Sequence, residues 1–376
     1  MKMTAPSEPS RAKQYQRQKQ ILTLIHLGVS PLILAGLILS RYPQKLAEFS
    51  ESLGLGWTAA FSVFFALFSL IFMIFDLPFS YYSGYLLEKK YGLSNQTPLT
   101  WAADFLKRAL LGFAVSLALL LALYTLILRY PETWWLWAWA GFALFTYGMG
   151  KLFPVLIVPL FYRYGPVESQ SLKSRIARLA ARFGLAVERI HSLNLSRTTR
   201  KANAAFMGMG KTKRVVLSDT LLQQFEEDEI EAVLAHELGH YRHYDIWRMF
   251  ALNLGITFIS FLLAWMILPQ AAARFDLQGP GDMAGLPLLL LIFSFFSFLI
   301  QPLTHGISRS IETQADHFAL TALGSKDAFI RCMRKLAEVN LADPEPHPLY
   351  EWFFYDHPAI HRRIAYAEAL KLPKPA

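Results

Sequence analysis

Long apolar stretches alternate with short polar ones along most of the chain, and this pattern predicts membrane-spanning helices. A helix needs about 20 apolar residues to cross the hydrocarbon core of a bilayer. About six stretches approach or exceed that length, and they cover residues 21–39, 57–78, 109–128, 134–160, 246–268 and 286–303. No small-residue cleavage site follows the first stretch, so we expect it to be a membrane anchor and not a removed signal peptide. The pattern predicts a mainly α, polytopic membrane protein with about six or seven transmembrane helices.

A longer polar segment, residues 163–245, separates the fourth apolar stretch from the fifth. Its "NAAFMGMGKTKRVVL" is typical of two strands joined by a Gly-Lys turn, and "ERIHSLNLS" also has a strand-like run. The stretches "QSLKSRIARLAARFG" and "FEEDEIEAVLAHELGHYRHY" have helical spacing, and Asp228 followed by Glu231 resembles a capping box. We therefore expect an α+β segment at this place.

The order of these parts predicts the organisation of the chain. A polar segment precedes the first of the four helices, and a transmembrane hairpin and a polar tail follow the α+β segment. In residue numbers, the expected parts are 1–20, 21–162, 163–245, 246–305 and 306–376. The prolines of "FPVLIVP", near the end of the fourth apolar stretch, predict a kink.

Composition and charge support a membrane location. The 376 residues are 54% hydrophobic and only 17% charged, whereas soluble domains carry about 25% charged residues. Lys and Arg gather before the first stretch, between the second and third, and in the α+β segment. The positive-inside rule therefore places the amino terminus, the α+β segment and the tail on the cytoplasmic side of a lipid bilayer. No compact basic motif with interleaved aromatics is present, so we do not expect nucleic acid as a partner.

The stretch "AVLAHELGHYRHYDIW" carries the candidate chemistry. On a helix, His236 and His240 lie on one face, so both imidazoles reach one metal ion. Glu237 is one step round the helix, where its carboxylate would take a proton from a metal-bound water. This H-E-x-x-H pattern predicts one catalytic zinc ion per chain, although a chance match on an ordinary helix is the alternative.

A catalytic zinc needs a third protein ligand, and a carboxylate after the last apolar stretch is the best candidate. In "SRSIETQADHFAL", Glu312 and Asp316 are one helical turn apart. We expect Glu312 to bind the metal and Asp316 to accept the outer N–H of a ligand histidine. A solvated acidic helix face is the alternative for this pair, and His243 is a competing ligand.

The motifs "AHELGH", "ETQAD" and "HPAIHRRI", together with "LLEKKYGLSNQT" and "NAAFMG", resemble those of the type I CAAX prenyl proteases, which are integral-membrane zinc endopeptidases. The resemblance is to a bacterial-type member, and it implies that the α+β segment is zincin-like. It implies the ligands His236, His240 and Glu312, and Glu237 as general base. It also implies that His357 and Arg363 of the tail lie near the metal, with His357 as a transition-state donor. It further implies that the "NAAF" strand, with Asn203, Ala204 and Phe206, binds a peptide by edge pairing.

The predicted function is hydrolysis of peptide bonds in membrane-associated, possibly lipidated peptides, in the inner membrane of a bacterium. The substrate, its lipid and the oligomeric state stay open. One alternative is an HtpX-like quality-control protease for membrane proteins. Another is a metal-regulated transporter or scaffold without enzymatic activity, which gives no use for a glutamate fixed between two ligand histidines.

Overall fold

A computed structural model describes residues 11–182 and 190–372, so part of the expected amino-terminal segment, residues 1–10, lies outside the described residues. Within the described chain, six helical rods are long and apolar enough to cross a membrane. They are α1 (Arg11–Ser40), α3 (Trp57–Tyr81) with its extension α4 (Leu87–Lys90), α5 (Pro98–Arg129), α6 (Trp134–Leu152) with its extension α7 (Val158–Phe161), α11 (Asp245–Arg274) and α12 (Leu286–Leu323). The prediction of a polytopic helical membrane protein is confirmed.

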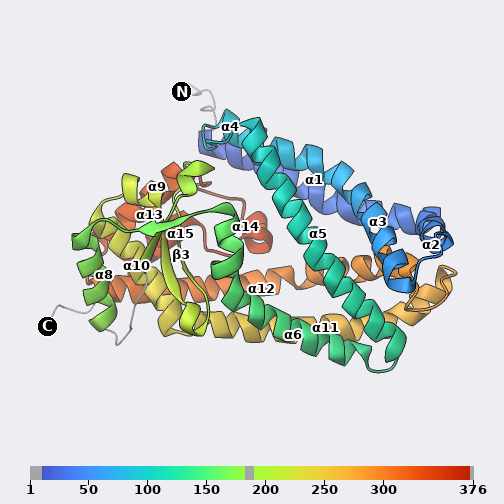
Figure 1. Cartoon of the computed structure of the whole chain (residues 1–376). Helices are drawn as coiled ribbons and strands as arrows, with labels where there is room; N and C mark the ends of the chain where they lie inside the picture. The colour runs from blue at the N-terminus through green and yellow to red at the C-terminus, as the bar shows by residue number, and fades with distance from the viewer. Residues whose placement is uncertain (1–10, 183–189, 373–376) are drawn as a thin grey trace, which may run out of the picture.

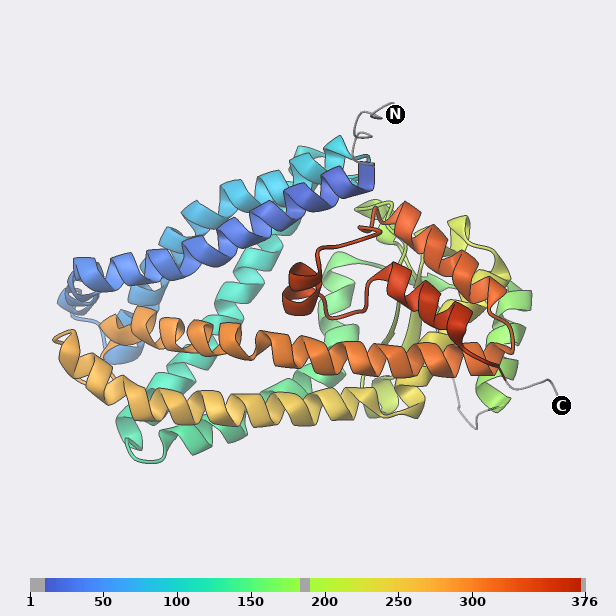
Figure 2. The same ribbon diagram turned by 180° about the vertical axis from the view of Figure 1, so that it is seen from behind.

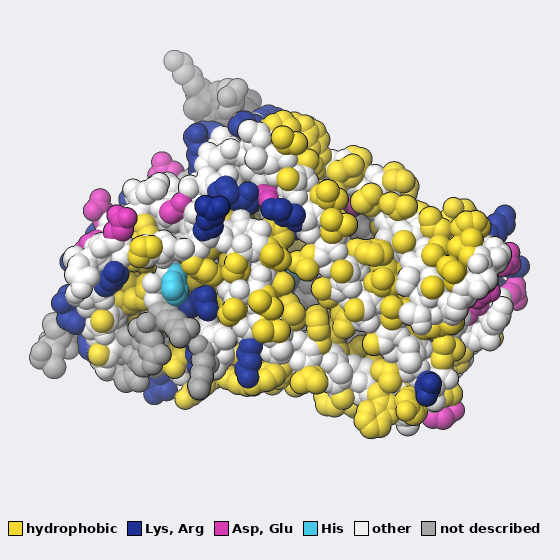
Figure 3. Space-filling view, in the orientation of Figure 1, with side chains coloured by type: hydrophobic (Ala, Val, Ile, Leu, Met, Phe, Trp, Pro, Cys, Tyr) yellow, Lys and Arg dark blue, Asp and Glu magenta, His cyan; other side chains and the backbone are white. Residues whose placement is uncertain are grey.

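The helices extend from the end of the molecule that holds the strands to a far end near the short helix α2 (Tyr42–Ser52) (Figure 1). The sequence pattern did not predict α2, which is a short amphipathic helix between two membrane helices. Aromatic side chains such as Phe61, Phe64 and Trp134 are fully buried in the core of the helical part. Apolar side chains also cover its surface, whereas charged side chains gather at the two ends (Figure 3). This distribution suits a bilayer around the middle of the molecule.

The expected kink at "FPVLIVP" takes the form of a π-helical turn, Phe153–Ile157, between α6 and α7. Proline has no N–H to give to the preceding turn, and a wider turn accommodates that loss. A similar π-helical turn, Tyr82–Leu86, joins α3 to α4. Both turns lie near the strand-bearing end of their helices.

The α+β segment contains a four-stranded mixed sheet in the order β1-β2-β4-β3. Its strands are β1 (Tyr164–Pro166), β2 (Ile190–Leu193), β3 (Ala204–Met207) and β4 (Arg214–Ser218). As predicted, β3 and β4 are antiparallel neighbours, with Ala204 opposite Leu217. The strand β3 lies at one edge of the sheet, so its outer side has no neighbouring strand.

Helices from both halves of the chain enclose the core of this segment. They are α8 (Gln170–Arg182), α9 (Asp219–Gln224), α10 (Glu227–Arg242), α13 (Asp327–Val339), α15 (Ile360–Ala369) and the end of α12. Seen from behind, α15 and the short helix α14 (Pro348–Phe354) lie beside α12, and α13 packs against α15, so the tail folds back over the α+β segment (Figure 2).

The predicted capping box of α10 is wrong by two residues. The helix has Glu226 as its N-cap, and the side chain of Glu229 accepts a hydrogen bond from the Glu226 N–H at 3.0 Å. Asp228 instead forms an ion pair with Arg331 of α13. Residues 226–229 are all acidic, so the sequence allows the helix to begin at more than one of them. The ion pairs of Asp228 and Glu229 with α13 favour the observed start.

A polar joint connects the membrane helices to the chain that leads into β3. Buried Glu88 at the end of α4 accepts a hydrogen bond from the hydroxyl of Tyr15 at 2.5 Å and pairs with the ammonium of Lys201 at 2.9 Å. In the "LSNQT" loop that follows, the N–H of Asn95 donates to the carbonyl of Thr198 at 3.0 Å. The motif between the second and third spans therefore has a structural use at this joint.

Candidate active site

Close packing of α10 against α12 assembles the site. A β-carbon at Gly239 would lie 3.0 Å from Cα and 3.2 Å from the carbonyl oxygen of Ala315. A larger residue at position 239 would therefore meet backbone that cannot turn aside. Gly239 lies within the H-E-x-x-H motif, and Ala315 lies between Glu312 and Asp316. The contact thus brings two motifs together that are more than 70 residues apart in the sequence.

Three ligand-type side chains converge where these helices meet. His236, His240 and Glu312 each offer one atom, and these atoms all lie within 4.8 Å of one another. The two Nε2 atoms are 3.1 Å apart, and Glu312 lies 3.2 Å from Nε2 of His236 and 3.4 Å from Nε2 of His240. His236 and Glu312 are buried.

The hydrogen bonds on the other side of each imidazole fix which nitrogen carries the proton. Nδ1 of His236 lies 2.8 Å from Asp316, and Nδ1 of His240 lies 3.0 Å from Asp245. A carboxylate only accepts hydrogen bonds, so each Nδ1 is the donor and each Nε2 is left with a lone pair. Oε2 of Glu312 is buried without a hydrogen-bond partner among the described residues. Three electron-rich groups therefore face one point, and this donor set fits a divalent cation.

The electrostatics of the site favour positive charge at the same point. Burial lowers the pKa of the His236 imidazole, but the adjacent carboxylates of Asp316 and Glu312 outweigh burial and raise the pKa to about 9. Burial also lowers the pKa of His240, and Glu312 again raises it above the ordinary value. The carboxylates thus stabilise positive charge beside the imidazoles, and either a proton or a metal ion can supply that charge.

Asp245 is a site residue that the sequence analysis missed. It is buried, and Arg248 holds its other oxygen at 2.8 Å. Tyr244 has a left-handed backbone, with φ 58° and ψ 34°, and this residue turns the chain between α10 and α11. The turn directs Asp245 back to His240. The signal in the sequence was an acidic residue five positions after a ligand-type histidine, but the unusual backbone at Tyr244 could not be predicted.

The carboxylate of Glu237 lies between the ligand cluster and the sheet. Its Oε2 accepts a hydrogen bond from the N–H of Phe206 in β3 at 2.9 Å. Glu237, His236, Asn203 and Ala204 line one cavity of about 500 Å³. Phe206 is absent from this lining, and its ring packs against Tyr241 instead. Asn203 and Ala204 therefore line the cavity. Phe206 contributes only its backbone N–H, which it donates to Glu237.

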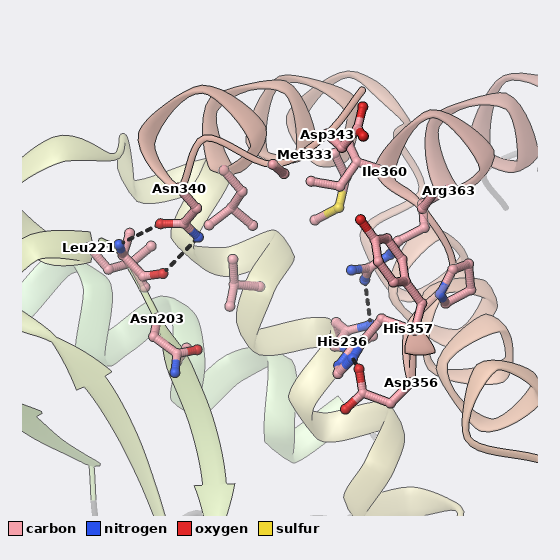
Figure 4. A pocket seen from close by; sticks show the side chains of 18 of the residues that line it. Asn203, Leu221, His236, Met333, Asn340, Asp343, Asp356, His357, Ile360 and Arg363 are labelled. Carbon is pink, nitrogen blue, oxygen red and sulfur yellow. Dashed lines mark hydrogen bonds and ion pairs between the residues drawn. The ribbon is translucent and has the colours of Figure 1, made fainter. Parts of the chain in front are cut away.

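The tail covers the cavity from the other side (Figure 4). Nε2 of His357 lies 3.3 Å from Glu312, and its Nδ1 lies 2.8 Å from Asp356. His361 is exposed. Arg363 holds Asp316 through two nitrogens, at 2.6 and 2.8 Å, and no ion pair joins it to Glu312 in the described chain. Arg363 therefore supports the carboxylate of Asp316 and not that of Glu312.

Comparison with known proteins gives two family matches that together span nearly the whole chain. Residues 166–371 match the model of peptidase family M48. Residues 2–163 match the model of the CAAX prenyl protease N-terminal family, which is described as five membrane helices.

Individual relatives and a solved structure agree with these matches. The chain is 30% identical to the uncharacterized metalloprotease YhfN of Bacillus subtilis, over 96% of this chain and 86% of that protein. It is 32% identical to CAAX prenyl protease 1 of Saccharomyces cerevisiae, over 80% of this chain and 70% of that protein. The crystal structure of S. mikatae Ste24p superposes with a TM-score of 0.84 at 26% identity, over 95% of this chain and 88% of that one.

The contact between Asp245 and His240 predicts that Asp245→Ala weakens metal binding. Loss of a carboxylate that orients a ligand histidine typically costs about 10- to 100-fold in metal affinity. Competition between the purified protein and a zinc chelator would measure the change. Asp276→Ala is the matched control, because Asp276 forms an exposed ion pair with Arg41 at the far end of the molecule. Equal metal affinity in the two variants would contradict the assignment.

Proposed function

Because the chain belongs to peptidase family M48 and is therefore a membrane-embedded metalloprotease, we propose that it is a zinc endopeptidase for membrane-associated peptides. The observation that carries the proposal is the convergence of two imidazole lone pairs and the buried Glu312 carboxylate on one point. Two histidines, one glutamate and an open fourth position are the ligand set of several catalytic zinc sites. His236, His240 and Glu312 would hold one zinc ion per chain.

Glu237 is the proposed general base. When bound, zinc would bring the pKa of a coordinated water toward ~7 and polarise the substrate carbonyl. Glu237 lies in the same cavity as the ligands, and the Phe206 N–H binds only one of its two carboxylate oxygens. The other oxygen is available to take the proton of the attacking water and pass it to the leaving amine. The hydrogen bond from Phe206 keeps the carboxylate oriented during both transfers.

The free edge of β3 is the proposed peptide-binding element. An extended peptide adds to an exposed sheet edge through backbone hydrogen bonds, which do not depend on its side chains. Asn203 and Ala204 line the cavity beside His236, and the backbone of Phe206 already reaches Glu237. A peptide on this edge would therefore place a carbonyl between the base and the metal ligands.

His357 is the proposed donor to the oxyanion that forms on the substrate carbonyl. Its imidazole lines the cavity opposite the H-E-x-x-H helix and reaches Glu312. Asp356 binds its Nδ1, which leaves Nε2 directed at the site. Pro358 follows it and restricts the local backbone. Arg363 contributes indirectly, because it holds Asp316 and through Asp316 the imidazole of His236.

The substrate class follows from the position of the site. The cavity lies at one end of six membrane helices, within reach of peptides that are anchored in the bilayer. The name of the yeast relative points to prenylated substrates for that protein, and a lipidated peptide is accordingly the proposed substrate class for this chain. The match of residues 2–163 to a CAAX prenyl protease family favours this function over an HtpX-like quality-control protease.

The charge distribution supports a cytoplasmic active site in a bacterial inner membrane. In the described chain, the far ends of the helices carry only four Lys and Arg residues, namely Arg41, Lys45, Arg129 and Arg274. The strand-bearing end holds the tail and the amino-terminal end of α1 (Figure 1). By the positive-inside rule, this end faces the cytoplasm.

Replacement of the base tests the proposal directly. Glu237→Gln should bind one zinc ion per chain, as the unmodified protein does, but lose about 10²–10⁴ in the rate of peptide cleavage. Glutamine has the size of glutamate, and its carbonyl oxygen still accepts the Phe206 N–H, so the fold should be kept. Metal analysis and a peptide-cleavage assay on the purified proteins would measure both effects. Near-normal turnover in this variant would place the base elsewhere.

A second prediction separates two histidines of the tail. His357→Ala should lower kcat by about 10²–10³, the usual cost of losing an oxyanion donor, while the zinc content stays unchanged. His361→Ala is the control and should have little effect, because His361 does not line the cavity. If alanine at 361 slows the reaction more than alanine at 357, His357 has a structural role only.

The topology predicts the behaviour of fusions at the carboxyl terminus. Green fluorescent protein fused after Ala376 should be fluorescent in a bacterial host, and alkaline phosphatase fused at the same point should be inactive. Both reporters depend on the side of the membrane that they reach. An active phosphatase fusion would reverse the proposed orientation.

A further inference from the structure

The backbone of the chain around β3 alternates between two sides. The N–H of Ser218 donates to the carbonyl of Asn203 at 2.9 Å, so Asn203 faces the neighbouring strand β4. In an antiparallel pair, the residues next to a hydrogen-bonded pair direct their N–H and C=O to the opposite side. The outer edge therefore presents the backbone groups of Ala202, Ala204 and Phe206. The bond from the Phe206 N–H to Glu237 is consistent with this alternation.

A side chain already occupies the first position on this edge. Asn340 follows the last residue of α13, and its carboxamide binds both backbone groups of Ala202. Its Oδ1 accepts the Ala202 N–H at 3.0 Å, and its Nδ2 donates to the Ala202 carbonyl at 3.2 Å (Figure 4). These are the two hydrogen bonds that a paired strand would make, so the Asn340 side chain takes the place of a peptide unit.

The next outward position on the edge, Ala204, is not occupied by a side chain in this way. In the part of the chain that the structure describes, the outward N–H and C=O of Ala204 have no hydrogen-bond partner. At Phe206, Glu237 holds the N–H and the carbonyl is left for a peptide. A peptide on this edge thus finds both groups at Ala204, one group at Phe206 and none at Ala202.

We propose that Asn340 is a specificity-determining residue that ends the strand pairing of the substrate after Ala204. Successive outward positions are two residues apart, or about 6.5–7 Å along a strand. The peptide therefore leaves the sheet edge within about two residues of Ala204 on this side. Pairing with a limited number of residues fixes the register of the peptide, and hence which bond lies beside Glu237. This inference rests on the proposed peptide binding at β3.

The place of Asn340 in the cavity supports this role. Asn340 lines the same cavity as His236 and Glu237, together with Asn203 and His357. It is therefore accessible to a bound peptide and is not merely part of the core. A residue that only connected α13 to the sheet would stabilise the fold without affecting which peptide N–H groups matter for cleavage.

An N-methylation scan of a substrate peptide would test the proposal. The probe is a fluorogenic peptide of about ten residues that the wild-type protein cleaves, methylated at one backbone nitrogen at a time. In wild type, methylation opposite Ala204 should lower kcat/KM about tenfold, the value of a lost hydrogen bond. Methylation two residues further toward Asn340 should change kcat/KM less than about twofold, because the substrate makes no hydrogen bond to Ala202 that could be lost.

Two variants should move this boundary by two residues. Asn340→Ser leaves a hydroxyl that is too short to bridge both backbone groups of Ala202, so a peptide N–H can then bind the Ala202 carbonyl. Asn340→Ala frees both groups. In each variant, methylation at the outer position should become costly by about tenfold.

Asn95→Ala is the matched control. Asn95 also binds the chain before β3 through its carboxamide, which donates to the carbonyl of Ser196 at 2.8 Å, but it lies away from the outer edge of β3. The control should keep the wild-type boundary. A wild-type scan without a boundary, an unmoved boundary in both Asn340 variants, or a moved boundary in the control would each overturn the inference. Undiminished cleavage by Glu237→Gln would instead overturn the proposed function.

Discussion

The buried carboxylate of Asp316 is the constraint on which the arrangement of the site depends. It is 1% exposed, and a charged group in such a place costs several kcal/mol unless partners surround it. The partners are His236 from α10 and Arg363 from α15, whereas Asp316 itself belongs to α12. The helices α10, α12 and α15, which are distant in the sequence, must therefore meet at the carboxylate of Asp316. Because α15 is drawn in by Arg363, the loop before it brings His357 over the cavity.

The same principle recurs at the second histidine. Asp245 binds Nδ1 of His240, as Asp316 binds Nδ1 of His236. Each carboxylate is also paired with an arginine, Arg248 for Asp245 and Arg363 for Asp316. Each imidazole is thus fixed in ring orientation and tautomer before any ligand arrives, which lowers the cost of binding one. The contact of Gly239 with Ala315 completes the arrangement, since the two carboxylates of α12 reach α10 only at that close approach.

Periodic features of this site and fold could be predicted from the sequence, and features set by tertiary contacts could not. The apolar stretches predicted the membrane helices, and four-residue spacing placed His236 beside His240 and Glu312 beside Asp316. The frame of the cap at Glu226, the partner of Arg363 and the role of Asp245 depend on neighbours far away in sequence or on one left-handed residue. Asn340 gives no sequence signal, because an asparagine after a helix is ordinary and only the position of Ala202 makes it a substitute for a strand.

The polar joint extends this reasoning to the membrane helices. Lys201 lies two residues before Asn203, and its ammonium reaches the Glu88 carboxylate at the end of the α3–α4 rod. Asn340 binds the intervening residue, Ala202, from the side of the tail. The entry into β3 is therefore held from both sides, by the membrane helices through Lys201 and by the tail through Asn340. A displacement of either part would shift the edge of β3 relative to Glu237. The proposed peptide-binding edge is thus positioned by the same helices that would contact the bilayer around the substrate.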